Sequence, residues 1–308
     1  MKSLKRNHFE NAYYNPRKFS MNKTLRVINV ILLIFIAFIM VYPFWEILVK
    51  SFMSDKDIIS STQFFWPKNW QFSGYKQIFS NKTYNFGNAF LVSVFVTVVT
   101  TIYQLAITTL AAYGLSRKTL PGRKFLNFFF IFTMYFGGGL IPYYLVIKNL
   151  GLMNQIWVLI IPQFISVYNV LIMRSFFRTF PSELVEAAKI DGANEFQVFM
   201  KIVLPLSKAI LATIALFIAV GVWNNWFTAM LFVTENNDVR PLAYVLQVII
   251  SSSQGVNDSI GGGGEYVELV GESVQYAAII VSTLPILCVY PFLQKHFTKG
   301  VMIGSIKG

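Results

Sequence analysis

The feature that most constrains this chain is a series of long apolar runs that contain no Asp, Glu, Lys or Arg. Examples are Val27 to Tyr42, Ala89 to Leu110 and Ala209 to Val222. A helix needs roughly 17–25 apolar residues to cross about 30 Å of hydrocarbon, and these runs have that scale. Only 13% of the residues are charged, about half the share in a typical soluble domain. The pattern predicts an all-α integral membrane protein.

We expect six membrane crossings. The third should break where three consecutive glycines, 137–139, precede Pro142, leaving residues 143–150 as a short piece at the outer interface. The approximate crossings are 25–49, 86–115, 125–141, 154–176, 206–233 and 274–293. The predicted organisation is an N-terminal tail 1–24, a transmembrane domain 25–296 with outer loops 50–85 and 234–273 and an inner loop 178–206, and a C-terminal tail 297–308.

The net charge of +12 does not indicate a nucleic-acid binder, because the basic residues flank the apolar runs. With these crossings, 19 Lys and Arg fall on one side of the membrane and 7 on the other. The positive-inside rule then places both termini in the cytoplasm. The first apolar run follows a polar tail and is too long for a signal-peptide core, so we expect an anchor. The single cysteine, Cys288, allows no internal disulfide.

Residues 178–206 predict a helix–turn–helix across the cytoplasmic mouth. Pro181 suits the first turn of a helix, and Gly192, after Asp191, suits a helix stop. Asn194 and Gln197 have the spacing of a capping box, which would start a second short helix.

The two short helices should each have an apolar face. In the first, the spacing puts Leu184, Ala187 and Ala188 together. In the second it groups Phe196, Phe199 and Met200, and Pro205 would open the fifth crossing. The plainer alternative is an amphipathic loop that rests on the bilayer.

Several residues of this segment match one motif. Glu186-Ala187-Ala188, then Gly192 after three residues, then Ile202, Leu204 and Pro205 resemble the EAA loop of ATP-binding-cassette importer permeases in every named position and both spacings. The resemblance implies a type I ABC importer transmembrane domain in a prokaryotic plasma membrane. It implies that this loop is the coupling helix that docks on a separate ATPase, with Glu186 pairing a basic residue there and Asp191 and Gly192 forming the turn.

Other segments support the same family. Residues 111–117, 141–142, 150–152 and 223–227 look like parts of sugar-type permeases. The C-terminal run from Phe297 resembles the tail of the second permease of maltose-type importers, which in that subunit reaches between the two ATPases. The residues implied in that contact are Lys299, Gly300, Gly304, Lys307 and Gly308. The triple glycine is similar to the branch that handles larger or acidic plant and host oligosaccharides.

The resemblance implies four kinds of partner: a related second permease, an ATPase dimer, an extracytoplasmic solute-binding protein and membrane lipid. The outer loop 234–273, which is acidic, is either a solvated surface or a contact for such a binding protein. We expect no bound cofactor, because ATP and Mg²⁺ would lie on the ATPase. The chain contains no Gly-Lys dipeptide, so it has no P-loop of its own. His8 and His296 lie in opposite tails, which argues against a metal site or a catalytic histidine.

The crossings contain almost no ionisable residues, and Glu46 lies near the outer end of the first. Ion-coupled carriers usually keep buried charges at mid-membrane, so an external energy source is favoured. The uncharged residues are either hydrogen-bonding contacts between helices or the lining of a path for sugars. The candidates for that path are Tyr168, Trp223, Asn224, Asn225 and Trp226. In relatives one permease can hold the substrate alone.

The sequence therefore predicts a permease subunit of an ATP-driven importer, with an oligosaccharide as substrate, and not an enzyme. Three alternatives remain. One is a permease for another solute, such as an amino acid, a peptide or a metal. The others are an ion-coupled secondary transporter or channel, which should show internal repeats or buried charges, and a membrane scaffold without transport activity.

Overall fold

A computed structural model describes residues 23–60, 65–67, 69–81, 84–253 and 271–305. All regular structure in these residues is helical, which confirms the predicted all-α class. The chain divides into two units, 1–47 and 48–308. The first contains most of helix α1, Lys23–Lys50, which has the length and composition to cross a membrane.

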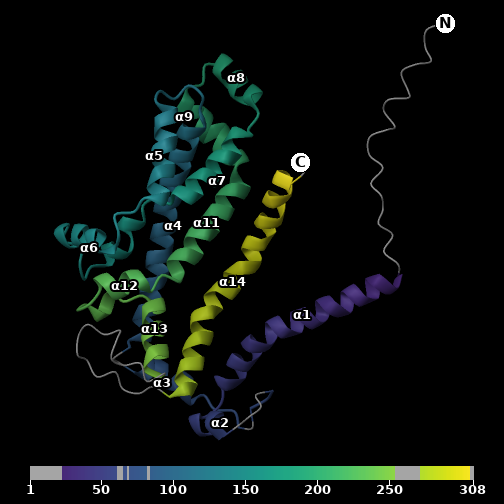
Figure 1. The fold of residues 1–308 in the computed structure, drawn as a ribbon, viewed down its shortest axis with the longest axis vertical. Coiled ribbons are helices and arrows are strands. Elements are labelled where there is room, and N and C mark those ends of the chain that lie inside the picture. Colours follow the sequence, from purple (N-terminus) through teal and green to yellow (C-terminus); the bar gives the residue numbers. More distant parts are fainter. Residues whose placement is uncertain (1–22, 61–64, 68, 82–83, 254–270, 306–308) are drawn as a thin grey trace. The chain divides into compact units, whose positions relative to one another are not determined.

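The second unit is built around the long helix α4, Phe86–Ser116. It packs against α7, Val167–Arg178, and α11, Lys208–Trp223. Helix α14, Glu272–Ser305, packs against α11 on one part of its length and against α13, Leu242–Ser253, on another. Figure 1 shows these helices running roughly lengthwise through the unit.

The predicted crossings correspond to continuous or broken helices. By length and composition, three helices of the described residues can each span a membrane, and up to six spans result if each bent pair is one span. Helices α5, Arg123–Tyr135, and α6, Leu140–Asn149, meet at 107°. The break includes the three glycines, and Gly139 has a φ of 85°, a conformation that glycine adopts without strain. The third helix thus ends at Tyr135 rather than at Ile141.

Three other helices differ from their predicted form. The fourth crossing is two short 3₁₀ segments followed by α7 after a 41° bend. The fifth begins at Lys208, and Asn224 interrupts it before α12. The sixth continues as helix to Ser305, through most of the predicted tail.

Short helices lie at both ends of this unit. Figure 1 shows α8 and α9 at one end and α2 and α3 at the other. Residues 254–270 of the acidic outer loop and the N-terminal tail through residue 22 lie outside the described residues. The shorter elements are α2 Asp55–Ser60, α3 Ser73–Ser80, η1 Ile156–Leu159, η2 Ile161–Gln163, α8 Ser182–Ile190, α9 Glu195–Val198, the π-helical η3 Phe199–Val203, α10 Leu204–Leu206, α12 Phe227–Phe232 and η4 Asn237–Val239.

Candidate functional site

The segment with the EAA-like motif forms a helical hairpin, α8 to α10, at one end of the second unit (Figure 1). Its first helix begins at Ser182, directly after Pro181, which occupies the cap position instead of the first turn. Glu186, Ala187 and Asp191 are exposed, so three of the predicted contact residues are accessible to a partner.

The predicted apolar face of α8 was wrong. Val185 and Ala188 are buried, whereas Leu184 and Ala187 are exposed. The helix packs against the core through the Val185–Ala188 side, because residues three apart share a face. The other apolar side chains of α8 therefore lie on its outer surface.

The turn of the hairpin depends on Gly192, whose φ is 84°. The Gly192 amide donates to the carbonyl of Lys189 at 3.0 Å, and the Ala193 amide donates to that of Ala188 at 2.9 Å. This pair of bonds is a Schellman motif, which commonly requires glycine at the left-handed position. The sequence prediction of a helix stop at this glycine agrees with the structure.

The second helix starts with the predicted capping box. The Asn194 side chain accepts from the Gln197 amide at 2.8 Å, and the Gln197 side chain accepts from the Asn194 amide at 3.0 Å. The expected grouping of three apolar residues was wrong, because Phe199 is buried while Phe196 and Met200 are exposed. Phe199 lies against the Tyr113 ring, with 4.7 Å between centroids.

The end of the hairpin differs from the prediction that Pro205 opens the fifth crossing. Ile202 and Leu204 are half-buried against the core, and Pro205 is exposed within α10. The chain then bends by 80° at Ser207, which is fully buried, and α11 begins at Lys208. The hairpin is thus joined directly to α11 by one residue at a sharp bend.

A polar cluster around Glu195 attaches the hairpin to α4. One carboxylate oxygen of Glu195 accepts from Arg117 Nη2 at 3.2 Å and from the Tyr113 hydroxyl at 3.1 Å. The other pairs with Lys189 Nζ at 2.5 Å. The Arg117 guanidinium also lies over the Tyr113 ring, 4.6 Å from its centroid. Glu195 therefore links α4, α8 and the start of the second hairpin helix.

The surroundings of Glu195 keep its carboxylate charged. The hydrogen bond from Lys189 and the charge of Arg117 hold the pKa of Glu195 below its ordinary value, although partial burial opposes this. Sequence reasoning missed this residue. Tyr113 and Arg117 were noted in a family-like segment, but nothing local indicates a partner some 80 residues away.

The hairpin exposes four large apolar side chains among its charged ones. Ile190 is 86% exposed and Phe196 is 66% exposed, and Leu184 and Met200 are also exposed. Exposed large apolar side chains are typical of protein contact surfaces. The hairpin thus presents apolar residues, with Glu186 and Asp191 beside them in the sequence, to a partner.

The candidates for a substrate path do not form one site. Tyr168 is exposed on α7, and Asn224 donates to the carbonyl of Val220 in its own helix at 2.8 Å. The indole of Trp223 donates to the carbonyl of Ser282 at 3.2 Å and packs edge-on against Phe90. Trp226 packs edge-on against Phe227. Trp223 therefore joins α11 to α14.

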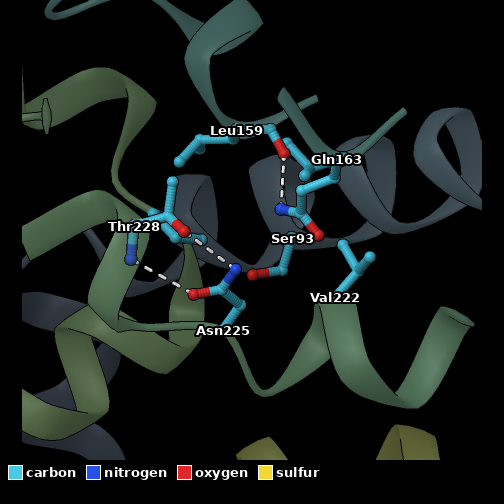
Figure 2. A pocket seen from close by; sticks show the side chains of 8 residues that line it. Ser93, Leu159, Gln163, Val222, Asn225 and Thr228 are labelled. Atoms are coloured by element: carbon cyan, nitrogen blue, oxygen red, sulfur yellow. Dashed lines mark hydrogen bonds between the residues drawn. The ribbon is translucent and has the colours of Figure 1, made fainter. Parts of the chain in front are cut away.

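Asn225 faces a small cavity, shown in Figure 2. Its volume is about 10 Å³, room for about one water molecule. The Asn225 side chain accepts from the Thr228 amide at 3.2 Å and donates to the Thr228 hydroxyl at 2.9 Å. In this conformation Asn225, one residue before the cap position Trp226, bonds the first turn of α12.

We predict that Asn225→Ala lowers the stability of the protein by about 1 kcal/mol, because α12 loses its cap. Asn225→Ser should restore part of the loss, since a hydroxyl can accept the same bond from the Thr228 amide without placing a charge in the membrane crossing. Thermal unfolding of both variants in detergent measures this. Equal stability of Asn225→Ala and the parent would contradict the capping role.

No group of three or more His, Cys, Asp or Glu side chains in the described residues could hold a metal ion. Of the predicted C-terminal contact residues, Lys299, Gly300 and Gly304 belong to the α14 helix, whereas Lys307 and Gly308 lie outside the described residues.

The chain is similar to a known family and to named relatives. Residues 120–303 match the family described as binding-protein-dependent transport system inner membrane component. The polygalacturonan/rhamnogalacturonan transport system permease protein YtcP of Bacillus subtilis is 42% identical over 278 residues, covering 90% of this chain and 96% of the relative. The arabinooligosaccharides transport system permease protein AraQ of Halalkalibacterium halodurans is 28% identical, and the match covers 89% of this chain and 94% of the relative.

A solved structure is similar as well. A bacterial ABC transporter involved in the import of the acidic polysaccharide alginate has a chain that superposes with a TM-score of 0.77 at 29% identity. The match covers 89% of this chain and 96% of that one.

Proposed function

Because the chain belongs to the family of binding-protein-dependent transport system inner membrane components, we propose that it is a permease subunit of an ATP-driven oligosaccharide importer in which the α8–α10 hairpin receives force from a partner ATPase. The observation that carries this proposal is an exposed apolar hairpin attached to α4 through Glu195 and to α11 through a one-residue bend. Such a hairpin is both accessible to a partner and mechanically joined to membrane helices.

The coupling follows from these attachments. Closure of the ATPase dimer would displace the docked hairpin as a rigid body. Glu195 would transmit the movement to α4, and Ser207 would transmit it to α11, which packs against α4 and α14. Switching between inward- and outward-facing states by rotation of packed helices is a known form of transition. The hydrolysis of ATP would take place on the partner.

The substrate class is proposed from the relatives. Their names refer to polygalacturonan, rhamnogalacturonan, arabinooligosaccharides and alginate, which supports an oligosaccharide and, for several of them, an acidic one. A related second permease would complete the translocation path. An extracytoplasmic binding protein would deliver the sugar, and both termini would face the cytoplasm.

The docking surface can be tested by co-purification of the ATPase with this chain. We expect Ile190→Asp to lower ATPase retention by about tenfold or more, because a charge would be buried in the interface. Ile59→Asp is the matched control, since Ile59 is 79% exposed at the opposite end of the unit. Full ATPase retention by an Ile190→Asp Phe196→Asp double variant would exclude the hairpin as the docking site.

A further inference from the structure

The first turn of α14 is held by a residue of α2. Helix α14 begins at Glu272, and the amide of the next residue, Ser273, donates to Asp55 Oδ1 at 2.8 Å. The first amides of a helix need an acceptor from outside the helix, and a carboxylate there also interacts favourably with the helix dipole. Asp55, the first residue of α2, therefore caps a helix whose first turn is 218 positions away in the sequence.

Two glycines let these elements approach closely. A Cβ on Gly271 would lie 2.7 Å from Asp55 Cγ, and a Cβ on Gly74, in α3, would lie 2.5 Å from the Ser273 carbonyl oxygen. Real Cβ atoms do not make contacts this short, so a larger residue at either position would displace its neighbour. The start of α14 thus lies directly against both the Asp55 carboxylate and α3.

Buried side chains complete this contact. Ser51 is fully buried, and its hydroxyl bonds to the Tyr75 hydroxyl of α3 at 2.8 Å. Met53 and Ile58 are buried, and Tyr276 of α14 packs against their cluster. The contact of α2, α3 and the first turn of α14, here named the α14 joint, lies at the end of the unit opposite the hairpin (Figure 1).

We propose that Asp55 is a positioning residue for transport: it keeps the α14 joint closed in both the inward- and outward-facing states, so that α14 tilts about this end. Helix α11, which the bend at Ser207 connects to the hairpin, packs against α14. When the hairpin displaces α11, α14 is pushed from the side while its first turn is held. Hinge motions turn about a few residues at the end of an element in this way. The inference rests on the proposed function, because the ATPase must displace the hairpin.

Uptake into proteoliposomes that contain the partner permease and the ATPase tests the role of Asp55, with the loaded binding protein outside. A lost hydrogen bond to a charged group weakens a contact by roughly tenfold or more, and we expect Asp55→Ala to lower the maximal uptake rate per inserted protein at least about threefold. The apparent KM for the binding protein should not change. Asp55→Asn keeps an acceptor and should retain most of the rate. Glu272→Ala, the matched control, removes an exposed carboxylate from the same turn of α14 and should leave the rate unchanged.

Gly271→Ala tests the geometry without replacing Asp55. It should lower the uptake rate, because the new methyl group displaces the carboxylate from the Ser273 amide. In an Asp55→Ala background the same substitution should cause no further loss, since no carboxylate is left to displace. Residues in direct contact show such non-additive effects. Losses that add in the double variant would contradict the contact.

A disulfide distinguishes a joint that stays closed from one that opens. The closeness of a Cβ at position 271 to Asp55 Cγ gives the pair Asp55→Cys Gly271→Cys a spacing suited to a disulfide, and a Cys288→Ser background removes the native thiol. We expect low uptake by the reduced pair and a return toward the parental rate on oxidation, because the disulfide replaces the cap. The Cys288→Ser chain under the same oxidant is the control.

Three outcomes would overturn the proposal. Loss of the remaining uptake on oxidation would show that the joint opens in each cycle. Parental uptake by the reduced pair would show that the contact does not matter for transport, and failure of the disulfide to form would contradict the closeness of the two residues. Absence of ATP-dependent uptake by the parent chain would instead refute the proposed function, so the two failures are distinguishable.

Discussion

Replacement of Gly192 by valine is expected to lower substrate uptake about tenfold or more while the protein still inserts into the membrane. The φ of 84° at this position is strained for a β-branched residue, at a cost of about 1–3 kcal/mol. An added Cβ meets no atom within 4 Å, so the effect comes from the backbone and not from a clash. The two bonds of the Schellman motif would be lost, and the hairpin would no longer transmit force as one body.

Asparagine at the same position provides the control, because it tolerates the left-handed conformation better than other non-glycine residues. We expect Gly192→Asn to keep much of the uptake. The measurement is ATP hydrolysis and substrate uptake in the same proteoliposomes, with membrane content determined by immunoblot. Uptake by Gly192→Val equal to that of the parent would contradict the role of this turn in coupling.

Reversal of the charge at Glu195 is expected to have a comparable effect. Glu195→Lys would place a third positive charge beside Arg117 and Lys189 and remove the acceptor of the Tyr113 hydroxyl. The hairpin would then detach from α4. We expect uptake to fall about tenfold while ATP hydrolysis continues, because the ATPase could still bind the outer face of the hairpin.

Glu183→Lys is the matched control, because Glu183 is exposed in the first turn of α8 and the substitution makes the same change of charge as Glu195→Lys. It should cost only a few tenths of a kcal/mol through the helix dipole and keep most of the uptake. An equal loss of uptake in both variants would show that uptake depends on the overall charge of the hairpin and not on the contacts of Glu195.

The pH dependence of this contact follows from the lowered pKa of Glu195. A carboxyl whose folded-state pKa is depressed stabilises the fold above its ordinary value, here 4.5, and loses that contribution as the pH falls through the lowered pKa. The ion pairs therefore persist through the neutral range, and the attachment of the hairpin should not depend on pH there.

Local rules in the sequence predicted several features of the molecule correctly. The turn at Gly192 and the capping box at Asn194 are set by residues within a few positions of each other, so spacing alone identifies them. The break between α5 and α6 follows in the same way from three glycines and a proline.

Features that depend on distant packing could not be predicted. Periodicity groups the apolar residues of a short helix, but the side that is buried depends on what packs there. Phe199 is buried because the Tyr113 ring, from another helix, covers it. Two of the partners of Glu195, Arg117 and Tyr113, are 78 and 82 residues away in the sequence. The bond between Asn225 and the Thr228 amide likewise depends on a short helix, α12, that composition did not indicate.

The most direct test of the central claim is uptake of a labelled oligosaccharide by proteoliposomes that contain this chain and its partner permease, with and without the ATPase. The binding protein and ATP are present in both cases. The hairpin account predicts accumulation only with the ATPase, and loss of accumulation when Ile190→Asp prevents docking. Accumulation against a gradient without any ATPase would contradict it.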